Sequence, residues 1–322
     1  MIRRSPLPML ASAFATIAVA AALAAIPRAA AAQTPAASQP AADAPRNEPK
    51  RGHVDVAGAA IHYQLHGDLG SGKRPLLVLH GSFMSGDAMM PLIAPFTASR
   101  PVIAIDARGQ GRSSGVESEL SYERMADDAA AVLAELGVKK ADVLGYSMGG
   151  TLAIALAVRH PDKTGKQVIL SGTSRLDGWY PEVLTVIGKL TPEAFAGSPI
   201  ESEYKRLSPS PKKFGAMIEK VKALDARPFG WSDEDVLRIP GKTMVIVGDA
   251  DGVTLDQAIA LFKLRGGGDV GAATQGFLTA PPRARLAILP ATSHIGIMGE
   301  AATIAAMAIP FLDDKPPPPP AF

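Results

Sequence analysis

The 322-residue sequence contains no cysteine, and this absence excludes three classes of protein. It rules out a small domain held together by disulfides, a catalytic thiolate and a metal site with cysteine ligands. A chain without thiols is also compatible with an oxidising compartment. The free energy of folding must therefore come mainly from a buried apolar core.

An excess of charge of either sign is also missing, since the sequence has 33 basic and 31 acidic residues. No stretch interleaves lysine and arginine with aromatic residues, as a nucleic-acid surface would require. The zinc pattern H-E-x-x-H and an acid-rich calcium loop are both absent from the sequence. We therefore expect no nucleic-acid partner, no metal and no other cofactor, while the oligomeric state stays open.

Long apolar runs are lacking except at the N-terminus. Arg3 and Arg4 precede an apolar, alanine-rich stretch over residues 9–26, and alanines at 30–32 form a small-residue cleavage site. This order is typical of a secretory signal over residues 1–32. We expect its cleavage to leave no stable membrane span and the protein to be periplasmic or secreted. An uncleaved anchor and twin-arginine export remain alternatives.

Two proline-rich segments flank the expected fold. Residues 33–50 are rich in proline and alanine without apolar periodicity, which predicts a flexible leader. Residues 313–322 contain a run of prolines and predict an extended tail. Residues 51–312 lie between them and are long enough for one large domain, in a chain that is 47% hydrophobic.

Within this domain, continuous apolar runs alternate with helical patterns. Such runs are typical of parallel strands that are buried on both faces. They occupy residues 76–79, 102–105, 143–144, 168–170, 243–247 and 286–289. Before them, two short alternating segments at 53–56 and 61–65 predict a hairpin. The whole pattern predicts an α/β fold with a mostly parallel, doubly wound sheet.

Two segments interrupt this alternation. Residues 174–238 lack an apolar strand run and predict a helical cap inserted between two strands. We expect most of the cap's aromatic side chains to pack the cap onto the main domain and a minority to line a substrate pocket. These aromatic residues are Trp179, Tyr180, Phe195, Tyr204, Phe214, Phe229 and Trp231. Residues 265–282 include three consecutive glycines and predict a mobile loop near the functional site.

A G-x-S-x-G pattern occupies residues 145–149, between an apolar run and a helical pattern. Because glycine is frequent in this chain, the pattern alone is a weak signal. In this setting, however, a strand that turns sharply into a helix would expose the hydroxyl of Ser147. A serine hydroxyl becomes a strong nucleophile only beside a base, which an acid in turn orients.

Candidates for the base and the acid follow later in the chain. Of the six histidines, only His294 stands on a loop after the last predicted strand, which makes it the candidate base. Asp249 and Asp251 both follow the carboxyl end of the strand at 243–247, where ligand-facing residues gather in such sheets. Met148 would begin the helix after the serine, so its amide could stabilise a developing oxyanion.

Together these features resemble the α/β-hydrolase superfamily, in its esterase and lipase-like branch with a helical cap. The similarity covers residues 52–312. The motifs that carry it are His80-Gly81, Asp106–Ser113, Gly145–Gly150, Gly248–Asp251 and His294. The resemblance implies the α/β-hydrolase fold, with the cap at 174–238.

The resemblance also implies a catalytic triad. Ser147 would be the nucleophile, His294 the base, and Asp251 rather than Asp249 the acid, because families of this type place the acid three residues after the glycine. A serine nucleophile argues against the haloalkane dehalogenase and epoxide hydrolase branches, where an aspartate normally stands. It favours acyl transfer to water.

The oxyanion hole implied by the resemblance consists of backbone amides. One donor would be the amide of Met148, and the other that of Ser82, with Phe83 as the alternative. His80 would fix a loop rather than take part in catalysis. Residues 106–113 lack the lysine of a phosphate-binding loop, so we interpret them as a structural turn.

The function implied by these roles is hydrolysis of a small-molecule carboxylic ester through an acyl-enzyme. A lactonase and a carbon–carbon bond hydrolase with the same triad remain alternatives, because related folds support many reactions. A non-catalytic binding protein on this fold is a further alternative from a different class. The sequence does not indicate the size of the acyl or alcohol group.

Overall fold

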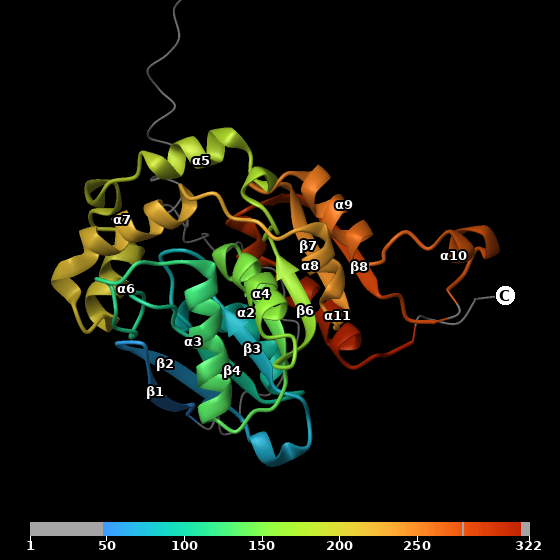
Figure 1. The fold of residues 1–322 in the computed structure, drawn as a ribbon, viewed down its shortest axis with the longest axis horizontal. Coiled ribbons are helices and arrows are strands. Elements are labelled where there is room, and N and C mark those ends of the chain that lie inside the picture. The colour runs from blue at the N-terminus through green and yellow to red at the C-terminus, as the bar shows by residue number, and fades with distance from the viewer. Residues whose placement is uncertain (1–47, 279, 317–322) are drawn as a thin grey trace, which may run out of the picture.

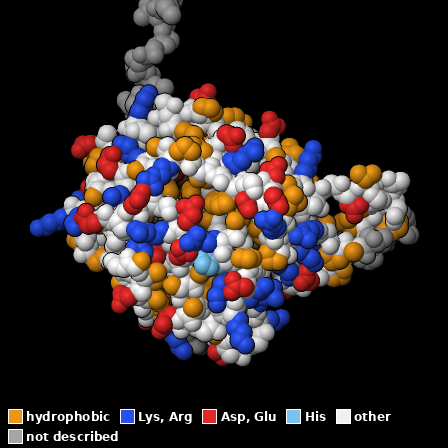
Figure 2. Space-filling model, viewed as in Figure 1, with side chains coloured by type: hydrophobic (Ala, Val, Ile, Leu, Met, Phe, Trp, Pro, Cys, Tyr) orange, Lys and Arg blue, Asp and Glu red, His pale blue; other side chains and the backbone are white. Residues whose placement is uncertain are grey.

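The computed structural model describes residues 48–278 and 280–316. The predicted signal, most of the predicted leader and most of the proline run in the predicted tail lie outside these residues. Among the described helices, none combines the length and the hydropathy needed to cross a membrane. On the face seen in Figure 2, positive and negative side chains are interspersed, as the balanced composition predicts.

The centre of the molecule is an eight-stranded sheet with the strand order β1-β2-β4-β3-β5-β6-β7-β8 (Figure 1). The strands are β1 (Lys50–Val56), β2 (Ala59–His66), β3 (Leu76–Leu79), β4 (Val102–Ile105), β5 (Ala141–Tyr146), β6 (Thr164–Leu170), β7 (Thr243–Ala250) and β8 (Ala284–Ser293). β1 and β2 form an antiparallel hairpin, and the strands from β3 onward run parallel to one another. The mostly parallel, doubly wound sheet predicted from the sequence is thereby confirmed.

Helices cover both faces of this sheet, which explains why its central strands are apolar throughout. In β3, Leu77 and Leu79 belong to one hydrophobic cluster, whereas Leu76 and Val78 belong to the other. The first cluster includes side chains of three helices: α3 (Tyr122–Glu135), α4 (Met148–Arg159) and α9 (Leu255–Leu264). The second includes side chains of α2 (Met90–Thr97) and α11 (Ala301–Leu312). Alternate strand residues therefore point to opposite cores.

The segment 174–238 forms a helical cap between β6 and β7. Its helices are α5 (Pro181–Gly188), α6 (Pro199–Leu207), α7 (Phe214–Asp225) and α8 (Asp233–Arg238). The entry and exit of the cap pair with each other, because Leu176 N donates to Phe229 O at 3.1 Å and Trp231 N donates to Ser174 O at 3.3 Å. Phe195, Tyr204 and Phe214 are buried. The ring of Phe214 contacts those of Phe195 and Tyr204, and Phe195 also contacts Phe83 on the loop after β3.

The prediction that residues 265–282 form a loop near the functional site is wrong. The helix α9 follows the carboxyl end of β7 and returns the chain to the opposite edge of the sheet, as a crossover between parallel strands must. There Thr243 N donates to Arg283 O at 3.1 Å, at the amino ends of β7 and β8. This segment contains the short helix α10 (Val270–Gln275), which projects from the body of the molecule (Figure 1).

Candidate active site

Ser147 lies at a sharp turn between β5, which ends at Tyr146, and α4, which begins at Met148. Its backbone has φ 55° and ψ −120°, a conformation that costs a residue with a side chain about 1–3 kcal/mol. The neighbouring strand holds this turn, since Ser147 N donates to Leu170 O at 2.9 Å. The turn places the serine at the carboxyl edge of the parallel strands.

Two glycines make this turn possible because the backbone passes close to them on both sides. A Cβ atom on Gly145 would lie 2.0 Å from the carbonyl oxygen of Gly149. One on Gly149 would lie 2.1 Å from the carbonyl oxygen of Leu79 in β3. Any other residue at either position would push α4 away from the sheet. The G-x-S-x-G pattern therefore has a steric cause in this fold.

The structure brings the three predicted triad residues into contact. His294 Nε2 lies 2.9 Å from Ser147 Oγ, and His294 Nδ1 lies 2.7 Å from Asp251 Oδ1. The serine follows β5, the aspartate follows β7 and the histidine follows β8, so the carboxyl ends of three strands supply the group. Ser147 is 8% exposed and the Asp251 side chain is fully buried, while the imidazole is 23% exposed.

The surroundings of Asp251 keep its carboxylate ionised. Burial alone would raise its pKa, but the hydrogen bond and the charge of His294, with a hydrogen bond from the Ser171 hydroxyl, hold the pKa of Asp251 below its usual range. The amide of Val253 also donates to this carboxylate, at 3.1 Å. An ionised acceptor at Nδ1 favours the tautomer in which Nε2 is free to take a proton from the serine.

Asp249, the other candidate acid, does not face the imidazole. Its carboxylate accepts hydrogen bonds from the amides of Ala291 at 2.9 Å and Thr292 at 3.1 Å. Of the two aspartates that the sequence offered, Asp251 is therefore the one in contact with His294. Asp249 instead contacts the backbone of the loop that leads to the histidine.

The predicted oxyanion donors lie on two loops at the same edge of the sheet. Met148 is the first residue of α4, where amides have no partner within the helix. The amide of Phe83 donates to Gln110 Oε1 at 2.7 Å, so it is already engaged. In the described part of the chain, the amides of Ser82 and Met148 donate to no protein group. The geometry thus favours Ser82 over Phe83 as the second donor.

Gln110 was not singled out from the sequence. It is buried, and its side-chain nitrogen lies 3.7 Å from the sulfur of Met148, while its oxygen accepts from Phe83. Phe83 has a positive φ of 65°, which a side chain rarely adopts without support. Gln110 therefore braces both loops of the predicted oxyanion hole. The only signal for it in the sequence is its place within the segment 106–113.

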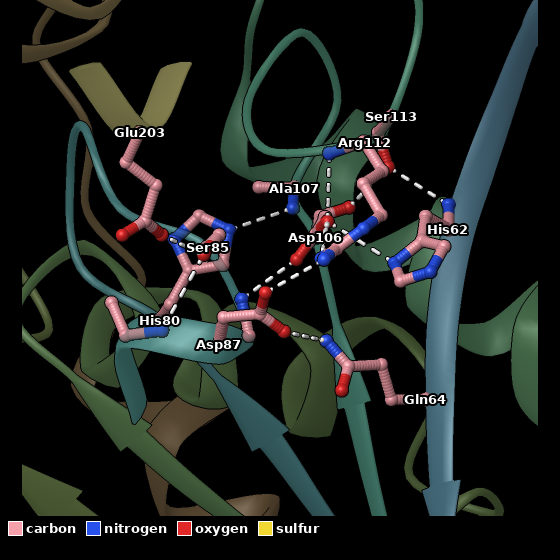
Figure 3. A network of polar contacts seen from close by, with 12 residues as sticks. His62, Gln64, His80, Ser85, Asp87, Asp106, Ala107, Arg112, Ser113 and Glu203 are labelled. Atoms are coloured by element: carbon pink, nitrogen blue, oxygen red, sulfur yellow. Dashed lines mark hydrogen bonds and ion pairs between the residues drawn. The ribbon is translucent and has the colours of Figure 1, made fainter. Parts of the chain in front are cut away.

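A network of polar contacts also holds the loop after β3 and the segment 106–113 (Figure 3). His80 Nε2 accepts from the amide of Ala107 at 2.8 Å, and Nδ1 lies 2.7 Å from Gly81 O. Burial lowers the pKa of His80, so the ring is neutral at pH 7. The buried Asp106 accepts from the amides of Gly86 at 2.6 Å and Arg112 at 2.7 Å. These contacts agree with the predicted loop-fixing and structural roles.

The cap reaches the site at two places. Glu203 of α6 accepts a hydrogen bond from the Ser85 hydroxyl, on the loop after β3 (Figure 3). The ring of Trp179 lies 5.2 Å from that of His294, edge to face. The Tyr146 hydroxyl donates to the backbone carbonyl oxygen of His294 at 2.9 Å. The contact of Tyr146 was not foreseen, because it joins residues far apart in the sequence.

The described residues contain no group of three or more histidine or acidic side chains placed to hold a metal ion. The potential ligands at the site, Asp251 and His294, are instead paired with each other. The chemistry that this arrangement can perform is nucleophilic attack by an activated serine.

Comparison with known proteins finds that the chain is similar to several proteins named as hydrolases. The family described as alpha/beta hydrolase fold matches residues 74–197, which include Ser147. RutD of Caulobacter vibrioides, which is named as a carbamate hydrolase, is 37% identical over 118 residues, or 36% of this chain and 44% of that protein. The chain therefore spans less than half the length of this relative. A 2-hydroxymuconate semialdehyde hydrolase of Pseudomonas putida is 28% identical over 63% of this chain and 79% of that protein.

A solved structure extends the comparison to most of the chain. Carboxylesterase CesB from Bacillus subtilis has a TM-score of 0.62 at 18% identity, and the match covers 83% of this chain and 92% of that chain. At this level of identity the likeness concerns the fold alone. Together with the family match, it confirms the fold predicted from the sequence.

Proposed function

The chain belongs to the α/β-hydrolase superfamily, and from this premise we propose that it is a serine hydrolase that cleaves small-molecule carboxylic esters through an acyl-enzyme. The observation that carries the proposal is the continuous contact from Asp251 through His294 to Ser147. Each member has the partner that this chemistry requires, and the buried acid is held in its ionised form.

In the first half of the reaction, Ser147 Oγ attacks the ester carbonyl carbon while His294 Nε2 takes the hydroxyl proton. The carbonyl oxygen becomes an oxyanion, which accepts hydrogen bonds from the amides of Ser82 and Met148. The tetrahedral intermediate then expels the alcohol, to which the imidazolium returns the proton. The acyl group remains bound to the serine as an ester.

In the second half, His294 takes a proton from water, and the resulting hydroxide attacks the acyl-enzyme. The same two amides stabilise the second oxyanion, and the serine leaves with the proton from the imidazolium. Asp251 stays ionised throughout and orients the ring. The products are a carboxylic acid and an alcohol, with no cofactor consumed.

A second candidate is hydrolysis of a carbon–carbon bond with the same triad. It is favoured by the match to the 2-hydroxymuconate semialdehyde hydrolase, which is the longer of the two sequence matches described above. A lactonase would use the same triad on a cyclic ester.

The N-terminal pattern of two arginines, an apolar stretch and small residues supports a periplasmic or secreted location as part of the proposal.

Rapid mixing with p-nitrophenyl esters of increasing chain length tests the proposal. We expect a burst of p-nitrophenol equal to the enzyme concentration and an intact mass raised by one acyl group. Ser147→Ala should abolish both signals. Turnover by the folded Ser147→Ala protein at the parent rate would refute the mechanism. A higher kcat/KM for 2-hydroxymuconate semialdehyde or for a lactone than for any ester would show that the ester is not the preferred substrate class.

A further inference from the structure

The register between β7 and β8 shifts just before the histidine loop. Gly248 pairs with Leu289 and Ala250 pairs with Ser293, so the single residue Asp249 of β7 lies opposite three residues of β8, Pro290–Thr292. A bulge of this kind leaves backbone amides of the longer strand without partners in the ladder. His294 follows only two residues after the bulge, so the path of the bulge determines where the imidazole stands.

The Asp249 carboxylate replaces the missing ladder partners. Pro290 has no N–H group, and the two remaining amides of the bulge, those of Ala291 and Thr292, both donate to Asp249, one to each carboxylate oxygen. Ala291 has a positive φ of 52°, a conformation that is unfavourable for alanine. The carboxylate thus holds a strained backbone in one conformation.

The same short segment of chain therefore holds the histidine in two ways. Asp251 contacts the imidazole, and Asp249, two residues earlier, contacts the backbone that carries it. A third contact comes from the hydroxyl of Tyr146 to His294 O. A displacement of the ring by one ångström would break the 2.9 Å contact between Nε2 and the Ser147 hydroxyl.

We propose that Asp249 is a positioning residue for His294, acting through the backbone of the bulge at 290–292. This role rests on the proposed hydrolase function. Asp249 does not touch the reacting atoms, so its removal lowers the fraction of time in which the imidazole can accept the serine proton. Substrate binding is affected much less, because the carboxylate faces the backbone of β8.

Three variants of the full chain separate this role from a general effect of charge. Asp249→Ala removes both acceptors and the charge. Asp249→Asn removes the charge and keeps the shape and one acceptor oxygen. Asp256→Ala is the matched control, because Asp256 is an exposed aspartate in the first turn of α9 and lies close in sequence to Asp249.

The readouts are kcat and KM for a p-nitrophenyl ester and the rate constant for labelling by a fluorophosphonate, each normalised to folded protein. We expect Asp249→Ala to lower kcat and the labelling rate about 10- to 100-fold, with KM changed less than about 3-fold. The kcat and the labelling rate of Asp249→Asn should lie between those of Asp249→Ala and those of the parent. Asp256→Ala should stay within about 2-fold of the parent.

A folded Asp249→Ala protein with the kcat of Asp256→Ala would overturn the positioning role while leaving the proposed function intact. If Asp249→Ala does not fold, the test rests on Asp249→Asn. A kcat of Asp249→Asn equal to that of Asp256→Ala would then overturn the positioning role. A parent that folds but forms no fluorophosphonate adduct overturns the proposed function and the positioning role together. The labelling of the parent thus distinguishes the two failures.

Discussion

Asp249 and Asp251 lie two residues apart, but their carboxylates hold different parts of one loop. Asp251 Oδ1 lies 2.7 Å from His294 Nδ1, whereas Asp249 accepts from two backbone amides of the bulge before the histidine. Because the buried Asp251 contacts the ring itself, its loss should affect proton transfer far more than the loss of any neighbouring carboxylate.

The first prediction concerns Asp251→Asn. The amide can donate a hydrogen bond to Nδ1, which favours the tautomer that presents an N–H group to Ser147. We expect kcat to fall about 10³- to 10⁴-fold, with a smaller change in KM. The comparison is with Asp249→Asn measured in parallel on the same ester. Equal losses in the two variants would argue against Asp251 as the triad acid.

The second prediction concerns the contacts of the Gln110 side chain with the two loops of the predicted oxyanion hole. Gln110→Ala removes the acceptor of the Phe83 amide at 2.7 Å and the contact with Met148. The loop that carries Ser82 then loses its support, and we expect kcat to fall about 10-fold or more, because a displaced donor stabilises the oxyanion less. Gln110→Glu keeps an acceptor for the amide and should recover part of the rate. An unchanged kcat in Gln110→Ala would show that the loop holds its shape unaided.

The third prediction isolates one hydrogen bond to the histidine loop. Tyr146→Phe keeps the buried ring and removes only the hydroxyl that donates to His294 O at 2.9 Å. We expect the free energy of unfolding to fall by about 1 kcal/mol and kcat to fall about 3- to 10-fold. Thermal unfolding and steady-state kinetics measure the two effects. A loss of stability without a loss of kcat would restrict Tyr146 to a structural role.

The fourth prediction concerns stability in the cap. Burial raises the pKa of Asp225, the last residue of α7, from 3.8 to about 7. Between about pH 4 and about pH 7, the Asp225 carboxyl therefore keeps its proton in the folded protein and loses it in the unfolded chain. Because the unfolded state binds fewer protons in this range, the free energy of unfolding falls as the pH rises. In Asp225→Asn this loss is absent.

The Asp225→Asn variant should accordingly gain melting temperature over the parent at about pH 8 and little or nothing at about pH 4. Measuring the difference between the two proteins at each pH cancels the titration of all other groups. A constant difference across this range would contradict the account, as would a gain confined to acidic pH.

The sequence was sufficient to predict the sheet and the three side chains that the structure brings into contact, because both depend on local signals. Runs such as 76–79 are apolar at every position, as a strand covered on both faces requires. Ser147 and His294 were identifiable from their places after predicted strands, and Asp251 from the resemblance of its segment to a known motif. In each case the carboxyl end of a parallel strand determines the location.

Other features depend on contacts between distant segments. The brace by Gln110 and the hydroxyl of Tyr146 join loops that only the folded chain brings together, so no local pattern marks them. The contact of Asp249 with the bulge was not predicted, because the bulge in β8 that leaves two amides for it appears only in the strand register. The position of 265–282 was misjudged because its glycines indicate a turn but not at which end of the sheet it lies.

The central claim is that Ser147 is an activated nucleophile, and intact-mass analysis after incubation with a fluorophosphonate tests it most directly. The full chain should gain one adduct, and neither Ser147→Ala nor His294→Ala should gain any under the same conditions. A folded parent protein without an adduct would contradict the claim, and so would an adduct that persists in Ser147→Ala.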